Sequence, residues 1–278
     1  RDRDVTGVQT CALPILLWDH LDVNLYSAYL CAKEKISRYQ LTLLNKLKMR
    51  NKNKKYFSCP ICNYQGPFLS IRRRYDACPK CGSVERHRLQ FLVFQELCKK
   101  YDISQLSMLH VAPEKYFEGL FKKEFLKYVT TDISKRKNVD YQADLRNLPF
   151  EDNTYDFVFA SHVLEHIQDD EKAITEIRRV LKPEGVAILP VPIVSKKTIE
   201  YPEPNPYESY HVRASGLDYF KKYEKHFGKV VVFSSKDFPE EYQLHIYEDR
   251  GNFPQRKKPL REPMEGEKHD DFVPVCIA

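Results

Sequence analysis

The sequence predicts an α/β fold, in which a mostly parallel sheet is covered by helices on both faces. Apolar runs rich in β-branched residues lie at 128–133, 157–160 and 185–193, and such runs are typical of buried strands. Between the last two runs, apolar residues recur at the spacing of a helix that packs on a sheet. They are Ala173, Ile174, Ile177, Val180 and Leu181. Strands that alternate with helices and are apolar on both faces favour a parallel sheet.

Further elements extend the pattern in both directions. A short apolar run at 108–111 predicts a strand, and a helix is expected to begin near Lys115. The intervening helix is expected to end at LKPEG, because proline and glycine stop helices. A helix from about Leu217, a strand at 229–233 and a last antiparallel strand in DFVPVCIA complete the set. The charged stretch GNFPQRKKPLREPMEGEKHDD is interpreted as an exposed or disordered loop.

Acidic residues stand at the ends of the predicted strands. Asp132 lies near the end of 128–133, and Asp144 closes a short run before 157–160. Ligands of open parallel sheets bind at the carboxyl ends of the strands, and a carboxylate accepts hydrogen bonds from two hydroxyls. Taken alone, each aspartate favours the interpretation as a solvated strand-end or turn residue. Their joint register favours a binding site.

These residues carry a resemblance to a known family. The strings DLRNLPFEDNTYDFVFASHVLEHI and AITEIRRVLKPEGVAILPVP resemble the central part of class I S-adenosylmethionine-dependent methyltransferases of the type 11 kind. The resemblance covers 106–193 well and the rest of the C-terminal half loosely. It implies a Rossmann-like, seven-stranded sheet and S-adenosylmethionine as cofactor.

The resemblance also implies roles for single residues. Asp132 matches the acid that holds the ribose hydroxyls in this family. Asp144 and Leu145 match the positions that reach the adenine, the first by its carboxylate and the second by its backbone. Ser161 and His162 match the segment beside the methionine part of the cofactor.

The turn after the first strand departs from the family pattern. A glycine-rich turn is usual there, because glycine lets the backbone approach the cofactor and take positive φ. In this chain Ala112, Pro113 and Glu114 occupy the turn, and His110 stands where an acid is usual. We expect His110, Ala112 and Glu114 to line the cofactor site. The string HVAPE also resembles the turn of a branch of the family that carries a zinc ribbon.

Four cysteines upstream predict a small metal-binding unit. CPIC and CPKC contain Cys59, Cys62, Cys78 and Cys81, with fifteen residues between the two pairs. This spacing matches a four-cysteine zinc ribbon, in which four thiolates close a tetrahedral, structural site. Two disulfides are the alternative, but they suit a secreted chain. No secretory signal is visible, and the enzyme-like fold favours a cytoplasmic protein.

A basic junction follows the ribbon and predicts how the two parts are joined. The string CGSVERHRLQFLVFQEL opens a helix whose first turn carries Arg86, His87 and Arg88. These side chains could face a substrate or fasten the ribbon to the catalytic domain, and we favour the fastening role.

The chain of 278 residues is long enough for one α/β core and a small satellite domain. We divide it into an adapter-like artefact (1–15), a helical and basic segment (16–55), the ribbon (56–88) and the methyltransferase domain (89–278). The artefact resembles a translated sequencing adapter. No apolar run is long enough for a membrane span.

The net charge of +6 is modest but is concentrated around the ribbon, in KLKMRNKNKKYF and in the arginines of 72–74. Such a patch could meet RNA or an anionic membrane surface, although a basic linker is usually only solvated.

The region after residue 193 is expected to select the substrate. A proline- and tyrosine-rich loop there is long enough to be a lid. Its candidate substrate contacts are Tyr207, Tyr210, His211 and Arg213. Aromatic faces suit a ring, and a guanidinium suits a carboxylate or phosphate. The tyrosines could equally pack the lid itself.

Methyl transfer from a sulfonium is a one-step in-line displacement, so the protein chiefly aligns donor and acceptor. If the acceptor must lose a proton, His162 and His211 are the candidate bases. The leading function is methylation of a small molecule or a glycan precursor. An RNA methyltransferase that docks RNA on the ribbon is the first alternative. A catalytically silent binding module, suggested by the missing glycines, is the second.

Overall fold

The computed structural model describes residues 55–278 except 136 and 138, and the expectations for the adapter-like segment 1–15 and nearly all of 16–55 lie outside this part. The described residues belong to one compact unit. No helix among them is long and apolar enough to cross a membrane.

The described elements follow the predicted alternation of strands and helices. The helices and helical turns are α2 (Glu85–Cys98), η2 (Ile103–Gln105), α3 (Lys115–Glu124), η3 (Leu164–His166), α4 (Asp170–Val180), η4 (Pro206–Glu208), η5 (Leu217–Phe220), α5 (Lys221–Glu224), η6 (Ser235–Asp237) and η7 (Glu240–Tyr242). The strands of the large sheet are β3 (Ser107–Val111), β4 (Lys127–Asp132), β5 (Tyr141–Gln142), β6 (Tyr155–Ala160), β7 (Leu181–Ile188), β10 (Lys229–Ser234) and β13 (Phe272–Ile277). Two-stranded antiparallel sheets pair β1 (Phe57–Ser58) with β2 (Gln65–Gly66), β8 (Ile199–Asn205) with β9 (His211–Ala214), and β11 (Ile246–Tyr247) with β12 (Lys268–His269).

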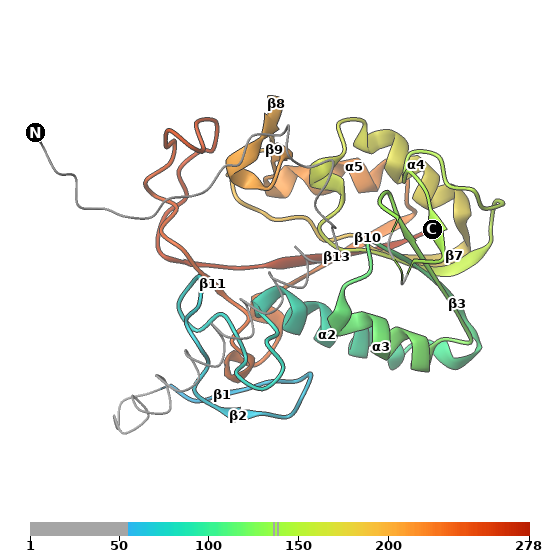
Figure 1. The fold of residues 1–278 in the computed structure, drawn as a ribbon, viewed down its shortest axis with the longest axis horizontal. Helices are drawn as coiled ribbons and strands as arrows, with labels where there is room; N and C mark the ends of the chain where they lie inside the picture. The colour runs from blue at the N-terminus through green and yellow to red at the C-terminus, as the bar shows by residue number, and fades with distance from the viewer. Residues whose placement is uncertain (1–54, 136, 138) are drawn as a thin grey trace, which may run out of the picture. The chain divides into compact units, whose positions relative to one another are not determined.

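The seven-stranded sheet has the order β10-β13-β7-β6-β3-β4-β5. All pairs from β7 to β5 are parallel, whereas β13 runs antiparallel to both β7 and β10. The predicted mostly parallel sheet is therefore confirmed, and so is the antiparallel last strand. Figure 1 shows α2 and α3 on one face of this sheet and α4 and α5 on the other.

The core forms two layers because side chains alternate along each strand. Phe157 and Phe159 of β6 pack under α2 and α3, where aromatic side chains predominate. Val158 and Ala160 face the opposite way, toward α4. A strand that is apolar on both faces is thus buried on both faces, as the sequence indicates.

Three expectations need correction. The helix expected from Leu217 is a helical turn, η5, followed by only four α-helical residues in α5. α4 ends at Val180, directly before LKPEG as expected, but β7 begins at Leu181, four residues before the expected start of the strand at Gly185. The stretch 251–271 is not simply exposed, because Phe253 and Arg261 are buried. Arg261 is held there by a two-pronged ion pair with the buried Glu208, at 3.0 and 2.7 Å.

Candidate functional site

The carboxyl ends of β3, β4 and β6 lie at one edge of the sheet. From β3 the chain adds β4 and β5 on one side and then crosses to add β6 on the other side, which makes this edge a topological switch point. β3 pairs with β4 on one side and with β6 on the other. The connections from β3 and β6 run to helices on opposite faces, α3 and α4 (Figure 1). In open sheets of this kind a crevice forms at such a switch point and ligands bind there.

Ala112 adopts the backbone conformation that a glycine would take in the turn after β3. Its φ is +48°, and its N–H donates to the carbonyl of Thr131 at 2.8 Å. α3 then begins with Glu114 as its N-cap residue. The turn keeps the left-handed geometry although it lacks the glycine, at a cost of about 1–2 kcal/mol for a residue with a Cβ.

The Ala112→Gly variant is therefore expected to raise the free energy of unfolding by about 0.5–1 kcal/mol. Relief of the left-handed strain outweighs the greater freedom of glycine in the unfolded chain. Urea unfolding would measure the change. The matched control is Ala143→Gly, at a position without positive φ, where the same substitution should destabilise by about 0.5–1 kcal/mol. Equal effects at both positions would contradict this account.

Glu114 is held by two residues from the first turn of α2. Arg86 donates to its Oε1 at 3.2 Å, and His87 Nε2 lies 3.3 Å from the same oxygen. His87 Nδ1 accepts from the N–H of Val84, so Nε2 carries the proton and donates to the carboxylate. Burial opposes ionisation, but these partners lower the pKa of Glu114 to about 2. Glu114 is ionised at neutral pH.

Asp132 ends β4 at the same edge and is only 4% exposed. Its Oδ1 accepts from the N–H of Ser134 at 2.8 Å. Asp144 lies in the turn beyond β5, where Arg146 forks onto both carboxylate oxygens at 2.6–3.1 Å. Hydrogen bonds from Arg146 lower the pKa of Asp144. The Leu145 side chain is buried in the core, which leaves its backbone for ligand contact.

Ser161 and His162 directly follow β6. The Ser161 hydroxyl hydrogen-bonds the Gln90 amide of α2 at 3.1 Å and is buried. His162 has positive φ, +54°, and its N–H donates to the carbonyl of Pro190 at 3.0 Å. Its Nδ1 lies 3.2 Å from Glu165 Oε1. Strained backbone therefore occurs at the carboxyl ends of two adjacent strands, which is common at binding sites.

The structure places His110 away from this edge. Its ring is buried within β3 among Phe121 and Phe159, and its Nδ1 lies 2.9 Å from the Tyr128 hydroxyl. Burial lowers the pKa of His110 to about 3. The expectation that its side chain lines the cofactor site is corrected, because β3 turns this residue toward α3.

The lid candidates separate into exposed and buried residues. Tyr207 and Tyr210 lie between β8 and β9 and are 63% and 64% exposed. Lys257 lies 5.4 Å from the ring centre of Tyr207. His211 is half-buried at the start of β9, with its ring edge-on to that of His166 at 4.7 Å. Burial lowers the pKa of His211 to about 4.

Arg213 corrects the expectation of a substrate contact. It is buried, and its guanidinium pairs with Glu200 at 3.0 Å and with Asp170 at 3.2 Å. The same group donates to three carbonyls of the segment after β6, those of Leu164, Ile167 and Gln168. Arg213 therefore fastens β9 to this segment, and its burial keeps it from a ligand.

The four cysteines of the predicted ribbon lie together. Their four sulfur atoms all lie within 4.8 Å of one another. Cys59 Sγ is 3.7 Å from Cys81 Sγ, and Cys62 Sγ is 3.6 Å from Cys78 Sγ. Four zinc–sulfur bonds of 2.3 Å in a tetrahedron would separate the sulfurs by about 3.8 Å. The cluster fits a zinc ion and contains no disulfide.

Arg88 joins the ribbon, α2 and the C-terminal region. It is completely buried and donates to the carbonyls of Asp76 and Ser83 on the ribbon side. It also donates to the carbonyls of Tyr242 and Gln243 after β10. These contacts agree with the fastening role expected for the junction.

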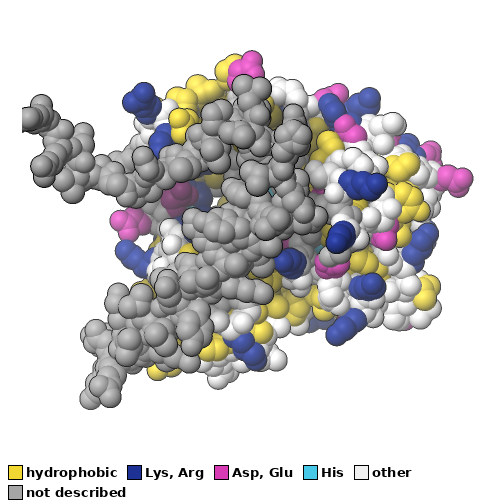
Figure 2. Space-filling view, in the orientation of Figure 1, with side chains coloured by type: hydrophobic (Ala, Val, Ile, Leu, Met, Phe, Trp, Pro, Cys, Tyr) yellow, Lys and Arg dark blue, Asp and Glu magenta, His cyan; other side chains and the backbone are white. Residues whose placement is uncertain are grey.

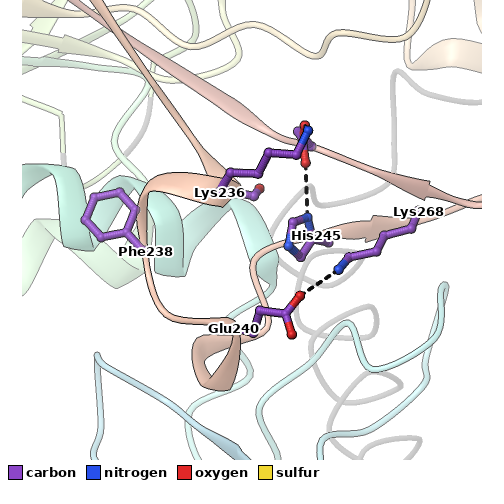
Figure 3. A pocket seen from close by; sticks show the side chains of 7 residues that line it. Lys236, Phe238, Glu240, His245 and Lys268 are labelled. Atoms are coloured by element: carbon purple, nitrogen blue, oxygen red, sulfur yellow. Dashed lines mark hydrogen bonds and ion pairs between the residues drawn. The ribbon is translucent and has the colours of Figure 1, made fainter.

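A pocket of about 280 Å³ lies at the β10 end of the sheet. Figure 3 shows Lys268 reaching toward Glu240, with which it forms an ion pair of 3.0 Å. Lys236 pairs with Asp270 at 2.6 Å. β10 is three strands from β6, or about 14 Å, and the pocket's lysines are already neutralised. The pocket is separate from the switch point.

Two of the three arginines at 72–74, within the described part of the chain, pair with acidic residues. Arg73 pairs with Glu85 at 2.5 Å, and Arg74 pairs with Glu267 at 3.7 Å. Outside the grey atoms, Figure 2 shows Lys and Arg interspersed with Asp and Glu. The described residues give no support to an RNA partner, and the basic run before Phe57 lies almost wholly outside them.

Comparison with known proteins agrees with this geometry. Residues 107–189 match a family model described as a methyltransferase domain. The matched residues contain β3 to β7 and hence every strand end of the switch point.

Several named methyltransferases are similar to this chain over part of their length. The demethylmenaquinone methyltransferase of Staphylococcus saprophyticus is 32% identical over 133 residues, which are 46% of this chain and 50% of the relative. The sterol 4-C-methyltransferase of Caenorhabditis elegans is 40% identical over 63 residues, 23% of this chain and 19% of the relative. The chain thus spans half or less of these relatives. An S-adenosylmethionine-dependent methyltransferase structure from Mesorhizobium loti aligns with 66% of this chain and 97% of its own, at 11% identity and a TM-score of 0.45.

The segment after β6 takes part in one arrangement that the sequence did not predict. Among Glu165, His166 and His211, only His211 is a candidate base or substrate contact from the sequence, whereas Glu165 and His166 lie in η3, directly after β6. The structure brings these three side chains together, with ligand atoms within 4.8 Å. No local spacing signalled this cluster, because His211 lies 45 positions after His166.

Proposed function

We propose that this protein transfers a methyl group from S-adenosylmethionine to a small molecule at the edge formed by the ends of β3, β4 and β6. The observation that carries the proposal is the match of 107–189 to a methyltransferase domain, with Asp132 at the end of β4. The names of the quinone and sterol methyltransferases support a small acceptor, and a glycan precursor belongs to the same size class.

The residues at this edge suit the parts of the cofactor. The buried carboxylate of Asp132 would accept from the ribose hydroxyls. The backbone beside Leu145, with Asp144, would contact the adenine. Glu114 and Arg86 present a negative and a positive group 3.2 Å apart, which suit the ammonium and carboxylate of the methionine end. Ala112 allows close approach of the backbone, and Ser161 would border the methionine end.

Bound S-adenosylmethionine supplies a methyl group on a sulfonium, and the chain's residues align the acceptor with it. We assign His162 as the base, where one is needed, because Glu165 lies 3.2 Å from its Nδ1 and would stabilise the imidazolium. His211 is neutral at neutral pH, but its pKa of about 4 makes it a weak base. Tyr207 and Tyr210 are the exposed aromatic residues that would contact the acceptor.

We propose further that Cys59, Cys62, Cys78 and Cys81 bind a structural zinc ion. Four thiolates complete the coordination, so the ion has no open position for catalysis. Its role would be to hold the ribbon against α2, and thus to hold Arg86 and His87 at Glu114. The Tyr116 hydroxyl, which donates to the Gly82 carbonyl at 2.9 Å, adds a second link from ribbon to α3.

Calorimetry with S-adenosylhomocysteine tests the proposed function. Wild-type protein should bind one equivalent. Asp132→Ala should weaken binding by about 10²-fold, because two hydrogen bonds to a charged acceptor contribute about 3 kcal/mol. The control is Asp102→Ala, the same change in an exposed residue before β3, at the opposite edge of the sheet. It should leave the affinity unchanged.

Absence of binding to the wild type would refute the methyltransferase proposal. Binding that is equal in wild type and Asp132→Ala would leave the activity possible but reject the ribose-binding role of Asp132.

A further inference from the structure

A cluster of three potential metal ligands lies beside His162. Glu165 and His166 belong to η3, directly after β6, and His211 begins β9. One ligand atom from each lies within 4.8 Å of the other two. His166 and His211 are separated by 45 positions in the sequence, yet their imidazole rings lie edge-on with their centroids 4.7 Å apart.

Two buried atoms of this cluster lack a partner among the described residues. Glu165 is 1% exposed; its Oε1 lies 3.2 Å from His162 Nδ1, but its Oε2 has no hydrogen-bond partner. Nδ1 of His211 is likewise buried without a partner. Burying an unsatisfied carboxylate is costly. A cation bound between these atoms would remove the cost.

Neighbouring groups hold the three side chains in position. His162 Nδ1 lies 3.2 Å from Glu165 Oε1, which orients the carboxylate and leaves Oε2 for another partner. Arg213 of β9 donates to the carbonyls of Leu164 and Ile167, at 2.6 and 2.8 Å. β9 and η3 are therefore tied together, as a preformed metal site requires.

We propose that Glu165, His166 and His211 bind a divalent first-row transition-metal ion, with zinc the first candidate. Two imidazoles and one carboxylate suit such an ion, whereas calcium and magnesium prefer oxygen ligands. Three protein ligands leave at least one position open, unlike the four-cysteine cluster. Because His166 is exposed, the open position is accessible to a small molecule.

The chemical class of the ligand follows from this open position. An ion held beside His162 would bind an oxygen of the methyl acceptor, such as a hydroxyl or carboxylate oxygen, and would orient it. This part of the inference rests on the proposed methyl transfer. The metal site itself does not.

Zinc content per chain is the decisive measurement. Full-length protein is dialysed against excess Zn²⁺, then against metal-free buffer, and the bound metal is counted by mass spectrometry. We expect two zinc ions in the wild type and one fewer in His166→Gln. The control is His226→Gln, a half-buried histidine that pairs with Glu171 at 2.8 Å; it should match the wild type.

The measured quantity is the difference in zinc content between the wild type and His166→Gln, so it does not depend on whether the four cysteines also hold zinc. His166 is exposed, and in the absence of added zinc its variant should keep the wild-type melting temperature. A second variant, His211→Gln, should also lose one ion. Equal zinc content in the wild type and both variants would overturn the metal site.

Two further titrations separate the inferences. S-adenosylhomocysteine should bind His166→Gln as tightly as it binds the wild type. If neither the wild type nor the variants bind it, the proposed methyl transfer is refuted and the metal site is unaffected. Acetohydroxamate, a bidentate oxygen ligand, should bind zinc-loaded wild type and not His166→Gln. Equal binding to both would overturn the acceptor part of the inference.

Discussion

The Cys62→Ser variant is expected to lose the zinc of the cysteine cluster and to unfold the ribbon. Zinc binding to a structural site of this kind contributes about 10–16 kcal/mol to folding, and three thiolates retain only part of it. The ribbon has a small core of its own, built around Cys59, Phe68 and Cys78. Such a core is too small to remain folded without the metal.

Limited proteolysis and zinc counting would check this prediction. Cleavage within 56–84 should appear in Cys62→Ser under conditions in which the wild type is intact. The matched control is Cys98→Ser, a free cysteine in α2 that lies outside the cluster; it should keep the ribbon zinc and resist cleavage. A folded, protease-resistant ribbon in Cys62→Ser would contradict the structural role of zinc.

The same variant should also weaken S-adenosylhomocysteine binding. The ribbon holds the first turn of α2, from which Arg86 and His87 reach Glu114 at 3.2 and 3.3 Å. Without that support the pair no longer fixes the carboxylate at the turn after β3. A tenfold loss of affinity is a reasonable expectation, since outer-shell partners typically contribute 10–100-fold.

The Arg88→Ala variant is expected to lower the free energy of unfolding by about 3–5 kcal/mol. Arg88 is fully buried. Its removal leaves the carbonyls of Asp76, Ser83, Tyr242 and Gln243 without this donor, and each buried unsatisfied group costs about 1–3 kcal/mol. It also empties the space above the Phe68 ring, which lies 4.6 Å from the guanidinium carbon.

Urea unfolding of Arg88→Ala, Arg88→Lys and Arg72→Ala measures this effect. Lysine should not restore stability, because one ammonium cannot reach carbonyls on both sides as the planar guanidinium does. Arg72 is exposed, so its replacement should change stability by no more than about 0.5 kcal/mol. Full rescue by lysine would show that charge alone is required at position 88.

Local sequence pattern was sufficient for most of the fold. The apolar runs at 108–111, 128–133 and 157–160 indicated strands of a sheet covered on both faces, and the stripe of α4 had the helical period. The ribbon was equally visible, because the spacing of cysteine pairs restricts which sulfurs can share one ion. The prediction of an exposed loop was wrong at Arg261, because this residue is buried in an ion pair with the buried Glu208.

The role of a residue could not be predicted from the local sequence where it depends on the direction in which the side chain points. The sequence placed His110 and Arg213 in the right segments. Only the tertiary structure shows that the His110 ring points into the core and that backbone carbonyls surround the Arg213 guanidinium. The sequence by itself determined the α/β fold, the methyltransferase resemblance and the clustering of four cysteines, because these follow from periodicity and spacing. Only the tertiary structure decided that Ala112 takes the left-handed conformation of a glycine. It also brought Glu165, His166 and His211 together, because β9 pairs with β8 and is fastened to the end of β6 by a buried arginine.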